Sequence, residues 1–192
     1  MLDKYTQHIK SDSFLVRIIA IFRIEPAQVN FMVMENAISD KHQAVIFDLK
    51  GSAVNRIVKG IFDYSNPPYG AILKDLNLIE SSYKLEVSEK LKESVLTTLQ
   101  RDINFLNEVM STDYSILLAI YQPNYSGESR YILEELNHVY SISIIDYLQK
   151  YNIAKYSERF LKKLVYRNKE ISVEHPQTYS SRLSAFIRTL FI

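Results

Sequence analysis

The sequence predicts an α+β fold in which strands and helices occupy separate stretches of one domain, residues 1–192. Three observations favour this class. Apolar, β-branched runs recur within residues 14–50, an amphipathic helical stripe fills residues 87–106, and two later apolar runs have the length of buried strands. With 192 residues, 47% of them hydrophobic, the chain is long enough to bury a substantial core.

The first part of the chain is expected to form a sheet. Residues 14–24 and 29–35 are apolar runs separated by a Glu-Pro dipeptide, which predicts two strands joined by a short turn. Residues 44–50 predict a third strand, and residues 2–10 resemble the end of a helix that leads into this sheet. Residues 60–82 contain an Asn-Pro-Pro sequence and no clear periodicity, so we expect a turn-rich connection there.

The second part begins with the clearest helix. Its apolar residues recur every three or four positions: Val87, Leu91, Val95, Leu99, Ile103 and Leu106. The opposite face carries charges of both signs and is expected to be solvated: Lys90, Lys92, Glu93, Arg101 and Asp102. Residues 114–121 predict a buried strand, residues 140–146 predict its partner, and Pro176 is expected to open a last helix.

Several classes of protein are excluded by composition. The absence of cysteine excludes disulfides, thiolate zinc sites and a cysteine nucleophile, and the four histidines are scattered. No two of the four glycines are closer than nine residues, so neither G-x-G-x-x-G nor a Walker A loop is present. No apolar run reaches the roughly 18 residues of a bilayer span, and no signal-peptide pattern opens the chain. We therefore expect a cytoplasmic location, including the cytosolic face of membranes.

Charge is divided unevenly along the chain. The formal net charge is only +1, but residues 147–192 carry nine basic and three acidic residues, whereas the rest of the chain is net acidic. Basic residues near an anionic leaflet each contribute about 1 kcal/mol to binding. The plainer alternative is a basic solvated helix. DNA binding is less favoured, because no helix-turn-helix or zinc pattern supports it, and no nucleic-acid partner is expected.

Three short segments carry residues that suit phosphoryl transfer: Asp48-Leu-Lys-Gly-Ser52, Thr112-Asp113-Tyr114-Ser115 and Ile144-Ile145-Asp146. Two carboxylates at adjoining strand ends with a lysine nearby could orient a hydroxyl, hold Mg²⁺ and neutralise phosphate charge. Taken singly, each acid is more often a turn or cap residue. Lys50 alone is more often a solvated lysine on an edge strand.

Six ordered blocks give these residues a context. They are Asp48-Leu-Lys-Gly-Ser52, Leu73-Lys-Asp-Leu-Asn77, Asp102-Ile-Asn-Phe-Leu106, Asp113-Tyr-Ser-Ile-Leu-Leu-Ala-Ile120, Ile144-Ile-Asp-Tyr-Leu-Gln-Lys-Tyr151 and Ile171-Ser-Val-Glu-His-Pro-Gln-Thr-Tyr179. Together they resemble the phosphatidylinositol phosphate kinase family. The resemblance implies a protein-kinase-like fold, with a truncated antiparallel small-lobe sheet in residues 1–50. The large lobe, residues 51–192, would hold helices, a small antiparallel sheet and a basic lipid-facing segment at about 147–170.

The resemblance also implies roles for individual residues. Asp113 would face the inositol hydroxyl, and Asp146 would hold Mg²⁺ against the ATP phosphates. Lys50, fixed in position by Asp48, would contact the phosphates. The segment that passes the adenine would be Met34, Glu35 and Asn36. The residues that would meet a phosphatidylinositol monophosphate in an anionic membrane are Lys150, Lys155, Arg159, Lys162, Lys163 and Arg167.

The sequence departs from the family pattern in ways that leave two hypotheses. Thr112, Ala119 and Tyr121 replace the usual Met, Gly and His, but none of these positions is assigned a proton or a metal. The family's glycine-containing loop and its strand lysine are expected to be absent from this chain. The first hypothesis is a lipid kinase resembling 1-phosphatidylinositol-4-phosphate 5-kinases. The alternative is a catalytically inactive phosphoinositide-binding descendant. The substrate isomer and the oligomeric state stay open.

Overall fold

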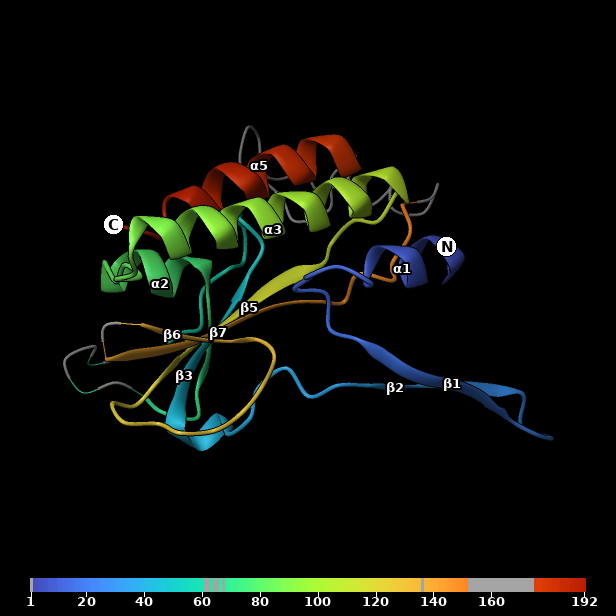
Figure 1. Ribbon diagram of the computed structural model, residues 1–192, viewed down its shortest axis with the longest axis horizontal. Coiled ribbons are helices and arrows are strands. Elements are labelled where there is room, and N and C mark those ends of the chain that lie inside the picture. Colours follow the sequence, from blue (N-terminus) through green and yellow to red (C-terminus); the bar gives the residue numbers. More distant parts are fainter. Residues whose placement is uncertain (1, 61–62, 64–65, 67, 136, 152–174) are drawn as a thin grey trace.

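The computed structural model describes residues 2–60, 63, 66, 68–135, 137–151 and 175–192. Within these ranges, a five-stranded sheet is covered on one face by helices, and a two-stranded ribbon extends away from it (Figure 1). This arrangement confirms the predicted α+β class. Among the described residues, no helix is both long and apolar enough to cross a membrane.

The larger sheet has the strand order β4-β3-β5-β7-β6. Its members are β3 (Ala44–Leu49), β4 (Ile72–Lys74), β5 (Ser115–Tyr121), β6 (Ile132–Glu135) and β7 (His138–Ile145). Every neighbouring pair is antiparallel except β3 and β4, which are parallel. The three central strands are the apolar runs that the sequence predicts as strands, and they are almost entirely buried.

Helices α3 (Glu89–Glu108), α5 (Pro176–Arg188) and α2 (Asp75–Ser81) cover one face of this sheet (Figure 1). Ser88 caps α3 by accepting a hydrogen bond from the Leu91 main chain, and α5 has Pro176 in its first turn, as expected. Alternate residues of each central strand enter the main core beneath the helices; on β3 these are Val45, Phe47 and Leu49. The opposite face therefore presents Ala44, Ile46 and Asp48.

The ribbon consists of β1 (Ile18–Ile24) and β2 (Val29–Met34), which pair antiparallel, and it follows the short helix α1 (Leu2–His8). Two main-chain hydrogen bonds fix its base to the end of β7. Val16 N–H donates to the Ile144 carbonyl at 3.0 Å, and Ile144 N–H donates to the Phe14 carbonyl at 2.7 Å. The ribbon leaves many large apolar side chains exposed. They are Ile19, Ile21, Phe22, Ile24, Val29, Phe31, Met32 and Val33.

The structure corrects four expectations. Residues 60–82 are not only turns, because β4 and α2 lie within them; these elements are too short for a detectable period. The strand β6 was not expected. The third strand, β3, pairs with β5 instead of joining the ribbon, so the larger sheet is a mixed five-stranded sheet and not a small antiparallel one. The division between residues 1–50 and 51–192 stays a prediction.

The fourth correction concerns Asp102, which the helical pattern placed on a solvated face. It is fully buried and accepts hydrogen bonds from Ser13 Oγ at 2.9 Å and Phe14 N–H at 2.7 Å, while His8 Nε2 lies 2.6 Å away. Burial raises the pKa of this carboxyl, although its hydrogen-bond partners oppose the shift. Asp102 therefore ties the segment after α1 to α3, a long-range contact that local periodicity does not reveal.

Candidate functional site

The strand register brings the predicted site residues to one end of the larger sheet. Leu49 of β3 pairs with Ile116 of β5, and Ser115 of β5 pairs with Ile145 of β7. Lys50 follows β3, Asp113 precedes β5 and Asp146 follows β7. Because adjacent strands alternate in direction, residues that follow one strand and precede the next lie at the same edge. Lys50, Asp113 and Asp146, which are far apart in sequence, therefore lie at the same edge of the larger sheet.

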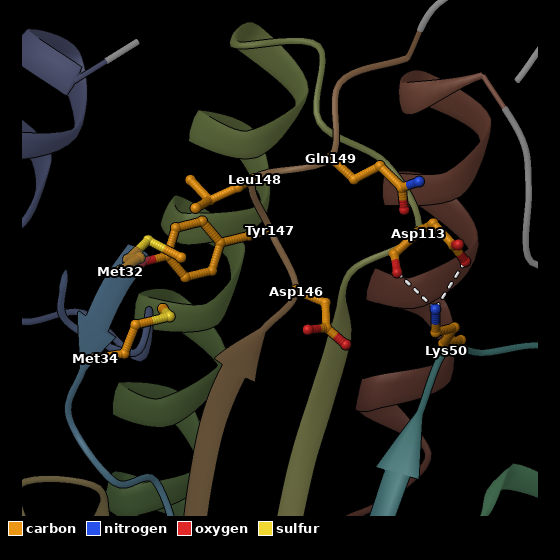
Figure 2. Close-up of a pocket in the computed structure, with 8 residues that line it drawn as sticks. All are labelled: Met32, Met34, Lys50, Asp113, Asp146, Tyr147, Leu148 and Gln149. Atoms are coloured by element: carbon orange, nitrogen blue, oxygen red, sulfur yellow. Dashed lines mark hydrogen bonds and ion pairs between the residues drawn. The ribbon is translucent and has the colours of Figure 1, made fainter. Parts of the chain in front are cut away.

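These residues line a pocket of about 350 Å³. Figure 2 shows the Asp146 carboxylate between two β2 methionines on one side and the Lys50–Asp113 pair on the other. The complete set of lining residues is Met32, Met34, Lys50, Asp113, Asp146, Tyr147, Leu148 and Gln149. The pocket therefore combines a charged wall at the sheet edge with an apolar wall from the ribbon, a combination typical of ligand sites.

The charged wall contains an ion pair. Lys50 Nζ lies 2.8 Å from Asp113 Oδ1 and also donates to the Asp113 main-chain carbonyl at 2.6 Å. The two side chains are 14% and 18% exposed, so the pair is sheltered but reachable from the pocket. The two contacts fix the ammonium at the beginning of β5 and orient the carboxylate beside it.

Both acids adopt an unusual backbone. Asp113 has φ of +64° and Asp146 has φ of +60°, the left-handed region that non-glycine residues seldom occupy. Aspartate tolerates this conformation better than most residues. The segment before Asp113 is held to the segment after Asp146, since Thr112 N–H donates to the Gln149 carbonyl at 3.1 Å. These turns set the direction in which the chain enters β5 and leaves β7 at this edge of the sheet.

The apolar wall depends on Tyr147. This side chain is fully buried, and its hydroxyl donates to the Val16 carbonyl at 2.5 Å, at the base of the ribbon. Burial raises the pKa of the Tyr147 phenol. The tyrosine thereby fixes the ribbon, with Met32 and Met34 on one face of β2, beside the carboxylate of Asp146.

The donor set fits a magnesium ion that is shared with phosphates. Among the described residues, no group of three His, Asp or Glu side chains is arranged to hold a metal on its own. Mg²⁺ bound to a nucleotide takes only one or two protein carboxylates and completes its shell with phosphate oxygens and water. Asp146, exposed and facing the pocket, has the required chemistry.

Some predicted site residues lie elsewhere. Asp48 pairs through its Oδ1 with Arg56 Nη2 at 3.0 Å. Its part in fixing the position of Lys50 stays a prediction. Glu35 accepts a hydrogen bond from Tyr131 at 2.6 Å, and Asn36 accepts one from Ile38 N–H at 3.2 Å. Neither Glu35 nor Asn36 lines the pocket, whereas Met34 does.

The predicted basic surface is only partly described. Lys150 is exposed and follows the pocket residue Gln149. The other predicted membrane-facing residues, Lys155, Arg159, Lys162, Lys163 and Arg167, lie outside the described residues.

Sequence reasoning missed four pocket residues: Met32, Tyr147, Leu148 and Gln149. Met32 could have been found from strand alternation, because it shares a face with Met34. The other three directly follow Asp146 in the same sequence block. Their location in the pocket follows from the left-handed turn at Asp146, which a sequence pattern does not specify.

Comparisons with known proteins show which family and which relatives the chain is similar to. The family model described as phosphatidylinositol-4-phosphate 5-kinase matches residues 1–134 and 126–190. A phosphatidylinositol 4-phosphate 5-kinase of Plasmodium falciparum is 27% identical over 97% of the chain and 13% of its own length. A putative 1-phosphatidylinositol 3-phosphate 5-kinase of Drosophila melanogaster is 29% identical over 92% of the chain and 9% of its own length. A phosphatidylinositol 5-phosphate 4-kinase type-2 gamma of Xenopus tropicalis is 31% identical over 64% of the chain and 30% of its own length. The chain thus spans less than a third of the length of these relatives.

Proposed function

The chain belongs to the phosphatidylinositol phosphate kinase family, and from this premise we propose that it transfers the γ-phosphoryl group of ATP to a hydroxyl of a phosphatidylinositol monophosphate. The observation that carries the proposal is the convergence of Lys50, Asp113 and Asp146 in one pocket. A module that only binds lipid has no need for an acid suited to magnesium beside an oriented lysine–aspartate pair. We also propose that ribbon and sheet correspond to the two lobes of a kinase-like fold.

The proposed reaction assigns one task to each residue. Asp113 accepts the proton of the attacking inositol hydroxyl while the new P–O bond forms and the bond between the γ-phosphorus and ADP breaks. Lys50 orients the Asp113 carboxylate and offers positive charge to the transferring group. Asp146 would hold Mg²⁺, which when bound neutralises phosphate charge.

The apolar wall suggests where the nucleotide base would lie. Met32 and Met34 project from the ribbon toward the pocket, on the side away from Lys50 (Figure 2). Flexible thioether side chains pack well against flat aromatic rings. We propose that these two methionines contact the adenine. The sequence predicts this role for Met34, Glu35 and Asn36. We now assign it to Met34 and Met32, because Glu35 and Asn36 do not line the pocket.

The lipid substrate is proposed at the level of its chemical class. The relatives bear names of 4-phosphate 5-kinases, 3-phosphate 5-kinases and a 5-phosphate 4-kinase, so the names support a monophosphate as substrate and a bisphosphate as product. Phosphatidylinositol 4-phosphate is our first choice, because the matching family model carries its name. The excess of positive charge in residues 147–192 supports peripheral binding to an anionic cytosolic membrane face.

The proposal is tested with the full chain, ATP labelled at the γ-phosphate, Mg²⁺ and vesicles that contain one phosphatidylinositol monophosphate at a time. We expect labelled bisphosphate from at least one isomer and none from vesicles of phosphatidylcholine alone. Sedimentation of the same vesicles tests the alternative function. If the chain sediments with anionic vesicles but transfers no phosphate, it is a phosphoinositide-binding module and the kinase proposal fails.

A further inference from the structure

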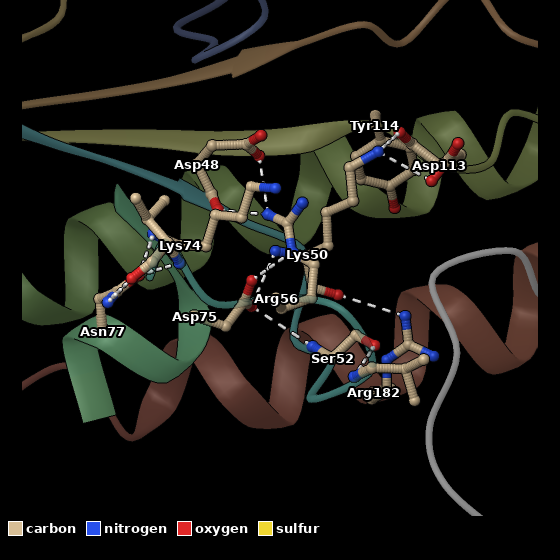
Figure 3. Close-up of polar contacts among 12 residues, drawn as sticks. Asp48, Lys50, Ser52, Arg56, Lys74, Asp75, Asn77, Asp113, Tyr114 and Arg182 are labelled. Atoms are coloured by element: carbon tan, nitrogen blue, oxygen red, sulfur yellow. Dashed lines mark hydrogen bonds and ion pairs between the residues drawn. The ribbon is translucent and has the colours of Figure 1, made fainter. Parts of the chain in front are cut away.

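A buried polar cluster adjoins the main chain of Lys50 and contains none of the other residues that line the pocket. Figure 3 shows Arg56 between two carboxylates, that of Asp48 at the end of β3 and that of Asp75 at the start of α2. Asp75 is 1% exposed and Arg56 is 7% exposed, so neither charge is solvated. Buried charges are costly unless they are fully paired, and this cluster therefore needs an explanation.

The Asp75 carboxylate connects the main chain of Lys50 to Arg56. One oxygen, Oδ1, accepts hydrogen bonds from the N–H groups of Lys50 at 2.9 Å and Ser52 at 3.3 Å. The other oxygen, Oδ2, accepts from Arg56 Nε at 2.7 Å. The carboxylate thus closes the turn that follows β3, where the ladder to β5 no longer supplies partners for the main chain.

Arg56 links this turn back to the strand. Its Nη2 atom donates both to Asp48 Oδ1 and to the Asp48 main-chain carbonyl. Burial alone would lower the pKa of the guanidinium, but the two carboxylates outweigh it and raise the pKa, so Arg56 stays charged. Because the guanidinium is planar and rigid, it fixes the spacing between Asp48 and Asp75 on either side of Lys50.

Lys50 is therefore held at three points. Asp75 binds its N–H, Arg182 Nη2 donates to its carbonyl at 3.2 Å, and Asp113 binds its ammonium. The side chain crosses from the turn to the beginning of β5 (Figure 3). A shift of the turn would move the base of this side chain and lengthen its contact with Asp113.

We propose that the Asp75–Arg56 pair is a positioning device that acts through Lys50. Neither residue lines the pocket. The pair sets where the Lys50 ammonium lies relative to Asp113. This proposal rests on the proposed function only in that Lys50 serves phosphoryl transfer. The position of the ammonium itself can be measured without any activity.

The central variant is Asp75→Asn, which keeps the size of the side chain and one acceptor oxygen but sets an amide N–H₂ against either Arg56 or the Lys50 main chain. The matched control is Asn77→Ala. Asn77 is equally buried, lies on the same helix and binds the main chain of Val58 and Lys74, but does not contact Lys50. Comparing the two at similar losses of stability separates positioning from general destabilisation.

The first readout is the rate at which an amine-reactive ester acylates Lys50, followed by mass spectrometry of the folded chain. We expect Asp75→Asn to raise this rate several-fold, because the ammonium leaves Asp113, and Asn77→Ala to leave it near the wild-type rate. Arg56→Lys provides a second variant in case Asp75→Asn does not fold. Arg56 binds Asp75 through Nε and Asp48 through Nη2. A lysine has one nitrogen in place of these two and cannot keep the same spacing between the carboxylates, so the acylation rate should again rise. Unchanged acylation in both site variants would overturn the proposal.

The second readout is phosphoryl transfer, if the wild-type chain is active. Misplacement by about 1 Å costs up to about 10²-fold in rate, so we expect kcat of Asp75→Asn to fall about 10- to 10²-fold with little change in the KM for ATP. The double variant Asp75→Asn with Lys50→Ala should be no slower than Lys50→Ala alone. Additive losses would contradict action through Lys50. An inactive wild type with altered acylation would refute the kinase proposal and leave the positioning proposal standing.

Discussion

The ammonium of Lys50 lies 2.8 Å from the carboxylate of Asp113, although 63 positions separate the two residues in sequence. The contact exists because β3 and β5 are paired antiparallel, with Lys50 just after one strand and Asp113 just before the other. Asp146 faces the same pocket from the end of β7.

Replacing the proposed proton acceptor should abolish most of the activity. Asp113→Asn keeps the shape of the side chain but cannot accept the proton of the hydroxyl, so kcat for lipid phosphorylation should fall about 10²- to 10⁴-fold. Initial rates with labelled ATP measure the effect. The control is Glu134→Gln on the exposed face of β6, which should retain the wild-type rate. Wild-type activity in Asp113→Asn would remove this residue from the reaction.

Replacing the proposed magnesium acid should change the dependence on metal concentration. Asp146→Asn removes the charge but keeps one oxygen, so the Mg²⁺ concentration at half-maximal rate should rise about tenfold or more. The measurement is a Mg²⁺ titration at fixed ATP. A lower maximal rate with an unchanged Mg²⁺ midpoint would show that Asp146 does not hold the ion.

The turn after Lys50 should not tolerate a side chain. Gly51 has φ of +62°, and an added Cβ would lie 3.3 Å from Leu183 Cα and from Phe186 Cβ of α5. Gly51→Ala should therefore lower the free energy of unfolding by about 1–2 kcal/mol for the backbone strain and by roughly 1–3 kcal/mol more for crowding.

Urea denaturation tests this prediction, with Gly70→Ala as its control. Gly70 also has positive φ, +83°, but its added Cβ would meet nothing closer than 3.8 Å. Gly70→Ala should therefore show the strain alone. Equal losses in the two variants would mean that α5 does not pack closely on the turn at Gly51.

Stability should fall steeply at alkaline pH. Burial raises the pKa of several phenols above the ordinary value of 10.0: Tyr83, Tyr114, Tyr131, Tyr147 and Tyr179. Because the folded pKa lies above the unfolded one, the contribution of these groups is fully present below about pH 10 and is lost as the pH rises further. Urea denaturation at about pH 8 to 11 should show this decline.

A single substitution identifies the cause of the alkaline loss. Tyr179 is completely buried, and its hydroxyl donates a hydrogen bond to the Tyr114 main-chain carbonyl. Tyr179→Phe removes one of the raised phenols, so the stability of this variant should fall less steeply above about pH 10 than that of the wild type. Identical slopes, or phenolate absorbance from every tyrosine of the folded chain near pH 10, would contradict the account.

Much of the fold is local enough to predict from sequence. The period of residues 87–106 corresponds to α3, the apolar runs correspond to the central strands, and Pro176 opens α5. The elements that were missed, β4, α2 and β6, are short and are held by tertiary contacts. The pairing of β3 with β5 also escaped prediction, because strand partners are set by the packing of the whole sheet and not by either strand alone.

The candidate site was predicted in part for the same reason. Lys50, Asp113 and Asp146 were found from their sequence blocks and lie together, as does Met34. The ion pairs of Arg56 were not predicted, since the sequence does not indicate that Arg56 is buried between Asp48 and Asp75. Glu35 accepts a hydrogen bond from Tyr131, 96 positions away, and is not among the residues that line the pocket. A contact over this distance in sequence leaves no local pattern.

We propose that one pocket, lined by Lys50, Asp113 and Asp146, moves a phosphoryl group from ATP to a membrane lipid. The most direct measurement is the time course of labelled phosphatidylinositol bisphosphate formed by the wild type and by the Asp113→Asn and Asp146→Asn variants on the same vesicles. We predict a lipid product that accumulates with the wild type and is strongly reduced with either variant. Equal product from all three chains, or none from a folded wild type with any monophosphate, would contradict the account.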